Sequence, residues 1–290
     1  MTVHRRLGDL ELFPLGMGAM TLTQVEGVDE ARATRAVHAA LDAGIRLFDT
    51  ADVYGPIGAY GINELALTKA LRSWSGSLDD VVVATKGGHT RDGLTWWIDG
   101  SAEHLAKACR DSLRRLGVDS ISLYQHHRPD PRRPYAESME ALKKLHDEGL
   151  VQRVGISNAG VEQIRAAVDI LGPALVSVQN ELSPLVREHL PEVALCEELG
   201  LAFLAYSPFG GMREAKALGS QVADFAAVAE DRGVSPQQVA LAWLLAISPC
   251  VIPIPGASRP ESVLDSVRGV DLVLDPEELA RLQGSVDSHI

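Results

Sequence analysis

The stretch RLFDTADVYG (residues 46–55) begins as an apolar run and ends as a polar turn. Its apolar half is typical of a buried β-strand, and Asp49 and Tyr54 follow at the point where that run stops. The same change from apolar to polar recurs along the chain. It is therefore the unit from which we predict the fold.

Eight short apolar runs share this pattern, and segments with apolar residues at helical spacing lie between them. The runs are LGMGAM (15–20), IRLFDTA (45–51), VVVATK (81–86), ISLYQHH (121–127), VQRVGISN (151–158), ALVSVQNE (174–181), LAFLAYS (201–207) and CVIPIPG (250–256). Strands that alternate with helices favour right-handed crossovers and a parallel sheet. Eight such units predict an α/β fold, a (β/α)8 TIM barrel, as one domain over residues 1–290.

Two features of the N-terminal segment bear on this fold. RRLGDLELFPL (5–15) alternates around Gly8 and Asp9, which predicts a short β-hairpin closing the bottom of the barrel. GMGAMT (16–21) is similar to a dinucleotide-binding fingerprint and makes a doubly wound open sheet the alternative fold. However, Thr21 takes the place of the third glycine, and no helical pattern opens directly on these glycines.

The composition argues against several classes of function. The chain has 27 basic and 39 acidic residues and a formal charge of −12, so its surface should repel nucleic acid and anionic membranes. The three cysteines are far apart, which argues against a disulfide framework and a cysteine-only zinc site. No apolar segment is long enough for a secretion signal or a membrane span. We therefore expect a cytoplasmic protein with no metal and with neither nucleic-acid nor membrane partners.

Polar residues end six consecutive apolar runs. They are Asp49, Lys86, His127, Ser157-Asn158, Gln179-Asn180 and Tyr206-Ser207. Each has an ordinary explanation, such as capping of the next helix. However, the carboxyl ends of barrel strands meet at one mouth, where TIM barrels place their active sites. Six polar strand ends at one mouth favour a functional site.

Asp49, Tyr54, Lys86 and His127 could form a tuned proton donor. An ammonium beside a phenol stabilises the phenolate, so we expect Lys86 to lower the pKa of Tyr54. A carboxylate from Asp49 would keep the buried lysine charged. His127 would donate a hydrogen bond to a substrate oxygen or to the phenol. Such a group suits a reaction in which an oxygen gains negative charge.

Seven motifs occur in order over nearly the whole chain: FDTADVYG, ATKGG, LYQHHRPDP, VGISN, VSVQNELSPL, AYSPFGGM and IPIPGASRPESV. In this set and order the sequence resembles the aldo-keto reductase superfamily. The resemblance implies an oxidoreductase that reduces an aldehyde or ketone to an alcohol with NADPH (NADP+ in the oxidised form). It also implies that Tyr54 is the proton donor and that Asp49, Lys86 and His127 complete a catalytic tetrad.

The resemblance further implies which residues hold the cofactor. Ser157, Asn158 and Gln179 would bind the nicotinamide carboxamide, whose donor and acceptor suit side-chain amides, and Tyr206 would stack on the ring. SPFGG (207–211) would follow the pyrophosphate, and GASR (256–259) would bind the adenosine 2′-phosphate. The residues implied at these phosphate positions are Ser207, Pro208, Gly210, Gly256, Ser258 and Arg259.

The chain departs from the family pattern at two places. His126 stands before the tetrad histidine, where relatives usually have an aliphatic residue. Because strand residues alternate in direction, we expect His127 to face the barrel mouth and His126 to face the helices. Asp265 and Ser266 stand where relatives often have glutamate and asparagine near the adenine, so the resemblance assigns no adenine contact to them.

The long loop GGHTRDGLTWWIDGS (87–101) is expected to shape the substrate pocket, which we assign to Met20, Trp96 and Trp97. Two other functions remain as alternatives. One is an NADPH-binding redox sensor that acts through a protein partner. The other is an isomerase or aldolase that uses Lys86 as a Schiff base, which would require a neutral lysine beside Asp49. The sequence identifies neither the substrate nor a protein partner.

Overall fold

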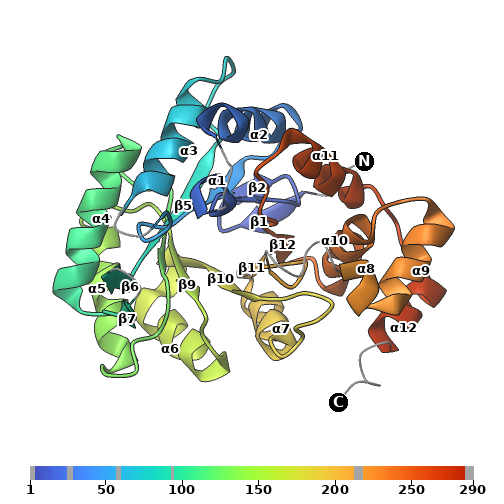
Figure 1. Cartoon of the computed structure of the whole chain (residues 1–290). Coiled ribbons are helices and arrows are strands. Elements are labelled where there is room, and N and C mark those ends of the chain that lie inside the picture. The colour runs from blue at the N-terminus through green and yellow to red at the C-terminus, as the bar shows by residue number, and fades with distance from the viewer. Residues whose placement is uncertain (1–3, 25–28, 57–59, 93–94, 212–217, 285–290) are drawn as a thin grey trace.

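The computed structural model describes residues 4–24, 29–56, 60–92, 95–211 and 218–284, and its centre is a parallel sheet of eight strands. In order of pairing these are β3 (Met17–Gly18), β4 (Leu47–Asp49), β5 (Val82–Gly87), β8 (Leu123–His126), β9 (Val154–Ser157), β10 (Leu175–Glu181), β11 (Ala202–Tyr206) and β12 (Val251–Pro253). Each overlaps one of the eight apolar runs. Helices surround this sheet (Figure 1), so the expected (β/α)8 fold is confirmed.

The first and last strands close the sheet into a barrel. The amide of Gly16 donates to the carbonyl of Pro253 at 2.9 Å, and that of Gly18 donates to Pro255 at 3.0 Å. A Cβ on Gly18 would lie 3.0 Å from the carbonyl oxygen of Ile254, closer than nearly all real contacts of this kind. These glycines therefore serve barrel closure, and the doubly wound open sheet is wrong.

The N-terminal hairpin closes one end of the barrel, as expected. It consists of β1 (Arg5–Leu7) and β2 (Leu10–Leu12), paired antiparallel. Leu7 and Leu12 are buried in one cluster with apolar side chains from the barrel strands. Those partners are Leu47, Val82, Ala84, Leu123, Val176, Ala202, Leu204, Ile252 and Ile254. This apolar plug leaves the opposite, carboxyl end of the strands for a site.

The helices bury apolar stripes against the sheet. They are α1 (Thr21–Gln24), α2 (Glu30–Asp42), α3 (Ile62–Arg72), α4 (Ala102–Leu116), α5 (Tyr135–Asp147), α6 (Val161–Leu171), α7 (Leu190–Leu199), α8 (Leu218–Gln221), α9 (Ala223–Arg232), α10 (Pro236–Ile247), α11 (Pro260–Val270) and α12 (Pro276–Gly284). In α4, for example, Leu105, Cys109 and Leu113 are buried, and Gly117 ends the helix at φ 63°. None of the helices in the described ranges has the length and apolar character that crossing a membrane requires.

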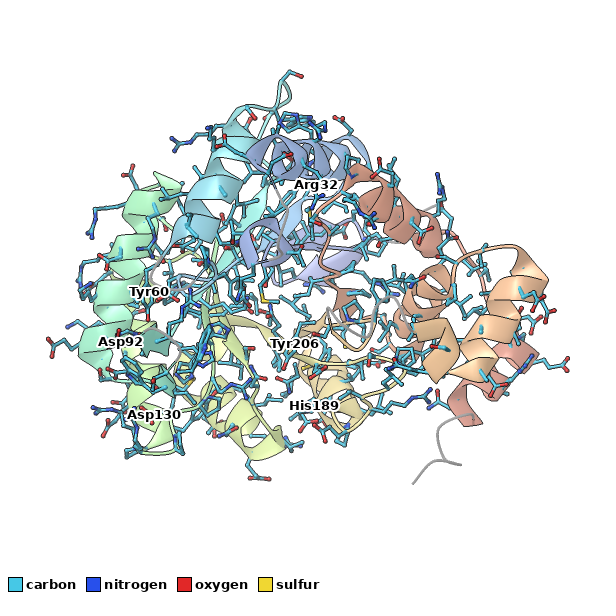
Figure 2. All side chains as sticks on the ribbon, viewed as in Figure 1. Arg32, Tyr60, Asp92, Asp130, His189 and Tyr206 are labelled. Atoms are coloured by element: carbon cyan, nitrogen blue, oxygen red, sulfur yellow. The ribbon has the colours of Figure 1, made fainter. Side chains whose placement is uncertain are left out.

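The segment expected to be a long loop after β5 folds into a second hairpin. It pairs β6 (His89–Asp92) with β7 (Thr95–Ile98), so that Arg91 lies opposite Trp96. The hairpin sits beside the loop that precedes α3, and Tyr60 and Asp92 lie near each other in Figure 2, while Tyr206 lies near the middle of the molecule. The sequence lacks a clear polar and apolar alternation here, which is why it predicted only a loop.

Candidate active site

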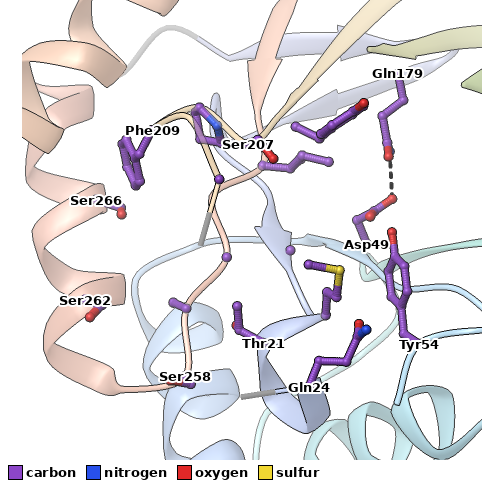
Figure 3. A pocket seen from close by; sticks show the side chains of 18 of the residues that line it. Thr21, Gln24, Asp49, Tyr54, Gln179, Ser207, Phe209, Ser258, Ser262 and Ser266 are labelled. Atoms are coloured by element: carbon purple, nitrogen blue, oxygen red, sulfur yellow. Dashed lines mark hydrogen bonds between the residues drawn. The ribbon is translucent and has the colours of Figure 1, made fainter. Parts of the chain in front are cut away.

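A cleft of about 720 Å³ opens at the carboxyl ends of the barrel strands. At one end it is lined by Met20, Asp49, Tyr54 and His127. In Figure 3, Asp49, Tyr54 and Gln179 lie on one side, and Ser262 and Ser266 on α11 lie on the other, with Ser258 on the segment before that helix. The cleft is therefore elongated, and its two ends carry different chemical groups.

The first end is organised by an ion pair. Lys86 Nζ lies 2.5 Å from Asp49 Oδ1, and both side chains are almost fully buried. The same ammonium donates to the carbonyl of Thr50 at 2.9 Å and lies 3.3 Å from Tyr54 Oη. Strands β4 and β5 are neighbours, so their ends bring the acid and the lysine together. The ammonium thus links the carboxylate to the phenol.

The second oxygen of Asp49 is also satisfied. Its Oδ2 accepts from Gln179 Nε2 at 2.7 Å and from Gln125 Nε2 at 3.0 Å. Gln125 lies on the inward face of β8 and is fully buried. Buried charges require such partners because they have lost their water. The carboxylate is therefore fixed in place by three strands.

Burial and charge act in opposite directions on the two titrating groups. For Lys86, burial alone would lower the pKa, but the charge of Asp49 and the contact with Tyr54 outweigh it and raise the pKa. Burial raises the pKa of Tyr54, and Lys86 opposes that rise only in part. The expectation that Lys86 brings the pKa of Tyr54 below its ordinary value is thus wrong, because removal of water from the phenolate dominates. At neutral pH the phenol keeps its proton.

His127 is the histidine that faces this site. Its ring lies 5.7 Å from the Tyr54 ring in an edge-on arrangement, and it lines the cleft. Burial and then the nearby Lys86 lower its pKa far below the usual range, so its imidazole is neutral. His126 points to the helices, with its ring 5.9 Å from that of Tyr135 on α5. Strand alternation therefore separates the two histidines in the direction that the sequence indicated.

Ser157, Asn158, Gln179 and Tyr206 all line the cleft, as do Asp49, Tyr54 and His127. The Asn158 amide donates to the carbonyl of His127 and to Ser157 Oγ, both at 3.0 Å. Tyr206 donates its hydroxyl to Asn158 Oδ1 at 2.8 Å. Ser157, Asn158 and Tyr206 thus form one bonded wall, while the Gln179 side chain beside it is bonded to Asp49, so these groups are oriented before any ligand binds.

The backbone of this wall is strained at two residues. Among the described non-glycine residues, Asn158 (φ 57°) and Ser207 (φ 49°) are those with positive φ. Gly210 (φ 82°) and Gly211 (φ 103°) follow, and the Gly210 amide donates to the carbonyl of Ser207 at 2.8 Å. Left-handed non-glycine residues cost on the order of 1–3 kcal/mol and occur mainly at ligand sites. Ser207, Pro208, Phe209 and Gly211 line the cleft, whereas Gly210 does not.

The far end of the cleft is formed by the start of α11. Gly256, Ser258, Arg259, Glu261 and Ser262 line it, and Arg259 and Ser262 are within 3.5 Å of each other. A Cβ on Gly256 would lie 3.0 Å from Thr21 Cγ2, so glycine lets the segment after β12 lie close to α1. The amides that begin a helix attract anions, and Pro260 occupies the first position of this helix.

Asp265 is less available to a ligand than its place in the cleft suggests. Its carboxylate accepts from Ser235 Oγ at 2.7 Å and from Gln238 Nε2 at 2.6 Å. Both partners belong to the start of α10, which packs against α11. The aspartate therefore joins two helices, and Ser266 lines the cleft beside it.

The hairpin places its two tryptophans in different surroundings. Trp96 lines the cleft, together with Met20 and with His89, which was not expected from the sequence. Trp97 does not line the cleft and instead borders a polar surface pocket with Asp99 and Arg132. Adjacent strand residues point in opposite directions, so only one of the two can face the cleft.

A contact between the hairpin and the Tyr54 loop was also missed. The buried guanidinium of Arg91 donates to the carbonyls of Gly55 at 2.8 Å and Pro56 at 2.6 Å, directly after Tyr54. Tyr60 donates to the carbonyl of Arg91 at 2.5 Å and lies 2.7 Å from Thr90 Oγ1. These bonds hold the loop that carries the phenol. No sequence pattern indicates them, because they join a loop to a hairpin of irregular composition.

Fold and site together define a TIM-barrel protein whose strand ends carry a buried Asp–Lys pair beside a tyrosine. The chain belongs to the aldo/keto reductase family, whose model matches residues 14–287. It is 37% identical over 276 residues to a 6-dehydroglucose reductase from Novosphingobium aromaticivorans, covering 92% of this chain and 90% of that protein.

Solved structures agree with this assignment. A glycerol dehydrogenase from Gluconobacter oxydans has 27% identity and a TM-score of 0.84, covering 100% of this chain and 96% of that one. An aldo/keto reductase from Klebsiella pneumoniae, solved with NADP and acetate, has 26% identity and a TM-score of 0.81. The match covers 98% of this chain and 95% of the Klebsiella chain. Family and relatives show that this protein is an oxidoreductase.

Proposed function

We propose that this protein reduces an aldehyde or ketone to an alcohol with NADPH and that Tyr54 donates the proton. The observation that carries the proposal is the contact of 3.3 Å between Tyr54 Oη and Lys86 Nζ, at the wall of the cleft. Lys86 is itself held charged by Asp49 at 2.5 Å. The Klebsiella relative solved with NADP and the Novosphingobium relative named as a reductase support the same chemistry.

The cleft fits a dinucleotide in size and in the order of its chemical groups. Ser157, Asn158 and Gln179 would hold the nicotinamide carboxamide, with Tyr206 against the ring. The positive-φ turn at 207–211 would hold the pyrophosphate through backbone amides. Ser258, Arg259 and the start of α11 would hold the 2′-phosphate. When bound, the cofactor supplies the hydride for the reduction.

The residues of this chain would manage the proton. Tyr54 stays protonated at neutral pH because burial raises its pKa, so its proton is available to an oxygen that gains charge. The Lys86 ammonium, 3.3 Å away, would stabilise the phenolate that remains. Asp49 keeps Lys86 charged and oriented, and neutral His127 can donate an N–H bond to the substrate oxygen.

The Schiff-base alternative conflicts with this geometry. A lysine must be neutral to attack a carbonyl, yet the pKa of Lys86 is raised and its ammonium is bonded to Asp49, Thr50 and Tyr54. We therefore do not propose an aldolase or isomerase mechanism.

The direct experiment is to follow NADPH consumption with a panel of aldehydes. The panel contains aromatic, aliphatic and sugar-derived compounds, the last because the 37% identical relative is named 6-dehydroglucose reductase. The proposal expects formation of the matching alcohol in amounts equal to the NADPH consumed. Binding of NADPH without turnover of any member would count against a carbonyl reductase.

The replacement Arg259→Ala is expected to weaken NADPH binding by about 1.5–3 kcal/mol, because charge-assisted hydrogen bonds to the 2′-phosphate are lost. NADH lacks this phosphate, so its affinity should change far less. Titration of both cofactors measures the difference, and Arg268→Ala, on the last turn of the same helix, is the control. Equal weakening of NADPH and NADH would show that Arg259 does not bind the phosphate.

A further inference from the structure

The charged side chains that line the cleft are unevenly distributed. The acids among them are Asp49, Glu261 and Asp265. Asp49 is neutralised by Lys86, and the other two lie on α11 at the far end. At the Tyr54 end the remaining charged side chain in the lining is Arg128, and it forms no ion pair with any other described residue. Arg128 therefore brings a positive charge into the lining at this end, although the whole chain carries a charge of −12.

Arg128 acts on the groups around the reacting end. It directly follows His127, lines the cleft and is exposed to solvent. Burial lowers the pKa of His89 and of His127, and the positive charge of Arg128 lowers both further. Burial and then Glu181, at the end of β10, raise the pKa of Tyr206, although Glu181 does not line the cleft. The charge of Arg128 and its hydrogen bond to the Tyr206 side chain lower that pKa. The guanidinium thus lies close to the position that a substrate would occupy.

His89 and Trp96 complete this end of the cleft. The His89 ring lies 5.1 Å from the His127 ring and 5.0 Å from that of Trp96. Because its pKa is lowered, His89 is neutral and can donate one N–H, and no described residue is hydrogen-bonded to its ring. Trp96 is 42% exposed and offers an apolar surface. Together the three side chains provide a cation, a neutral donor and a flat apolar wall.

We propose that the natural carbonyl substrate carries an anionic group, a carboxylate or a phosphate, which Arg128 binds with His89 as a second donor. The guanidinium fork matches the geometry of both anions, and an unpaired arginine can bind them without breaking an existing ion pair. A local cation is needed because the negative surface repels anions elsewhere. This inference rests on the proposed carbonyl reduction and defines the substrate class for the same site.

The test compares aldehydes that differ only in charge. The first pair is 4-carboxybenzaldehyde and its neutral amide, 4-carbamoylbenzaldehyde; the second is glyceraldehyde 3-phosphate and glyceraldehyde. The measured quantity is the ratio of kcat/KM for the charged and the neutral member of each pair. We expect a ratio of about 10 or more in at least one pair for the wild type, and the pair that shows it identifies the anion.

Variants test whether Arg128 causes the preference for the charged aldehyde. In Arg128→Gln the ratio should fall by about 10-fold or more, whereas Arg128→Lys should retain part of it because it keeps the charge. Arg165→Gln removes the same charge from the exposed face of α6, outside the cleft, and should leave the ratio unchanged. Rising ionic strength should lower kcat/KM for the charged member alone.

The two proposals fail in different ways. Reduction of all the aldehydes with ratios near 1, or a ratio that is unchanged in Arg128→Gln, would overturn the anionic substrate and leave carbonyl reduction intact. If none of the aldehydes causes NADPH to be consumed, both the anionic substrate and carbonyl reduction are overturned. If the ratio falls as much in Arg165→Gln as in Arg128→Gln, the net charge of the protein and not its position determines the preference. This result would also overturn the role of Arg128.

Discussion

Turnover of an aldehyde by Tyr54→Phe is expected to be about 10²-fold or more below that of the wild type, with NADPH affinity nearly unchanged. The replacement removes only the hydroxyl that would donate the proton. The ring, which packs edge-on against His127, remains in place. Steady-state kinetics with the best aldehyde measure kcat, and a fluorescence titration measures cofactor binding.

The matched control is Tyr135→Phe. Tyr135 lies on α5 outside the cleft, and no described residue bonds to its hydroxyl. Loss of that hydroxyl should therefore leave kcat unchanged. A Tyr54→Phe enzyme with wild-type turnover would refute the role of Tyr54 as proton donor, and equal losses in both variants would point to a structural effect.

The second large effect is expected for Lys86→Met, whose kcat should also fall by about 10²-fold. Without the ammonium, nothing opposes the rise that burial causes in the pKa of Tyr54, and the phenolate loses its stabilising charge. The carboxylate of Asp49 keeps its amide donors Gln125 and Gln179 but has no cation. An unpaired buried charge costs about 3–5 kcal/mol, so Tm should fall as well.

A double variant separates catalysis from stability. In Lys86→Met with Asp49→Asn, the unpaired charge is removed, so Tm should recover in part while kcat stays low. Thermal unfolding and steady-state kinetics are measured for the wild type, for Lys86→Met and for the double variant. If turnover recovers together with Tm, Lys86 acts only by maintaining the fold, and its role beside Tyr54 is contradicted.

The fold could be predicted from local patterns because barrel strands are short apolar runs with polar ends. Each of the eight runs contains or overlaps a strand, and Leu7 and Leu12 close the bottom as the N-terminal alternation indicated. The separation of His126 from His127 follows from the alternation of side chains along a strand. These features depend on residues close together in the sequence, so local sequence patterns are enough to predict them.

Other features depend on burial and on distant contacts. The sequence indicated that Lys86 would lie near Tyr54, but it could not show how deeply the phenol is buried. That burial raises the pKa of Tyr54. It offered Trp96 and Trp97 as equal candidates, and the pairing of β6 with β7 turns only Trp96 into the cleft. Arg128 lies one residue beyond the last position considered on its strand. The sequence could not show that Arg128 lines the cleft without an acidic partner among the described residues, because this depends on side chains from distant strands.

The central claim is reduction of a carbonyl carbon by hydride from NADPH, and the fate of deuterium tests it most directly. The protein is incubated with a reactive aldehyde and NADPH that carries deuterium at C4 on one face, and the alcohol is analysed by mass spectrometry and NMR. Two preparations of NADPH are compared, each deuterated on a different face of C4. We expect one deuterium on the carbinol carbon of the alcohol from one preparation and none from the other. An alcohol without deuterium from either face, or no alcohol at all, would contradict the account.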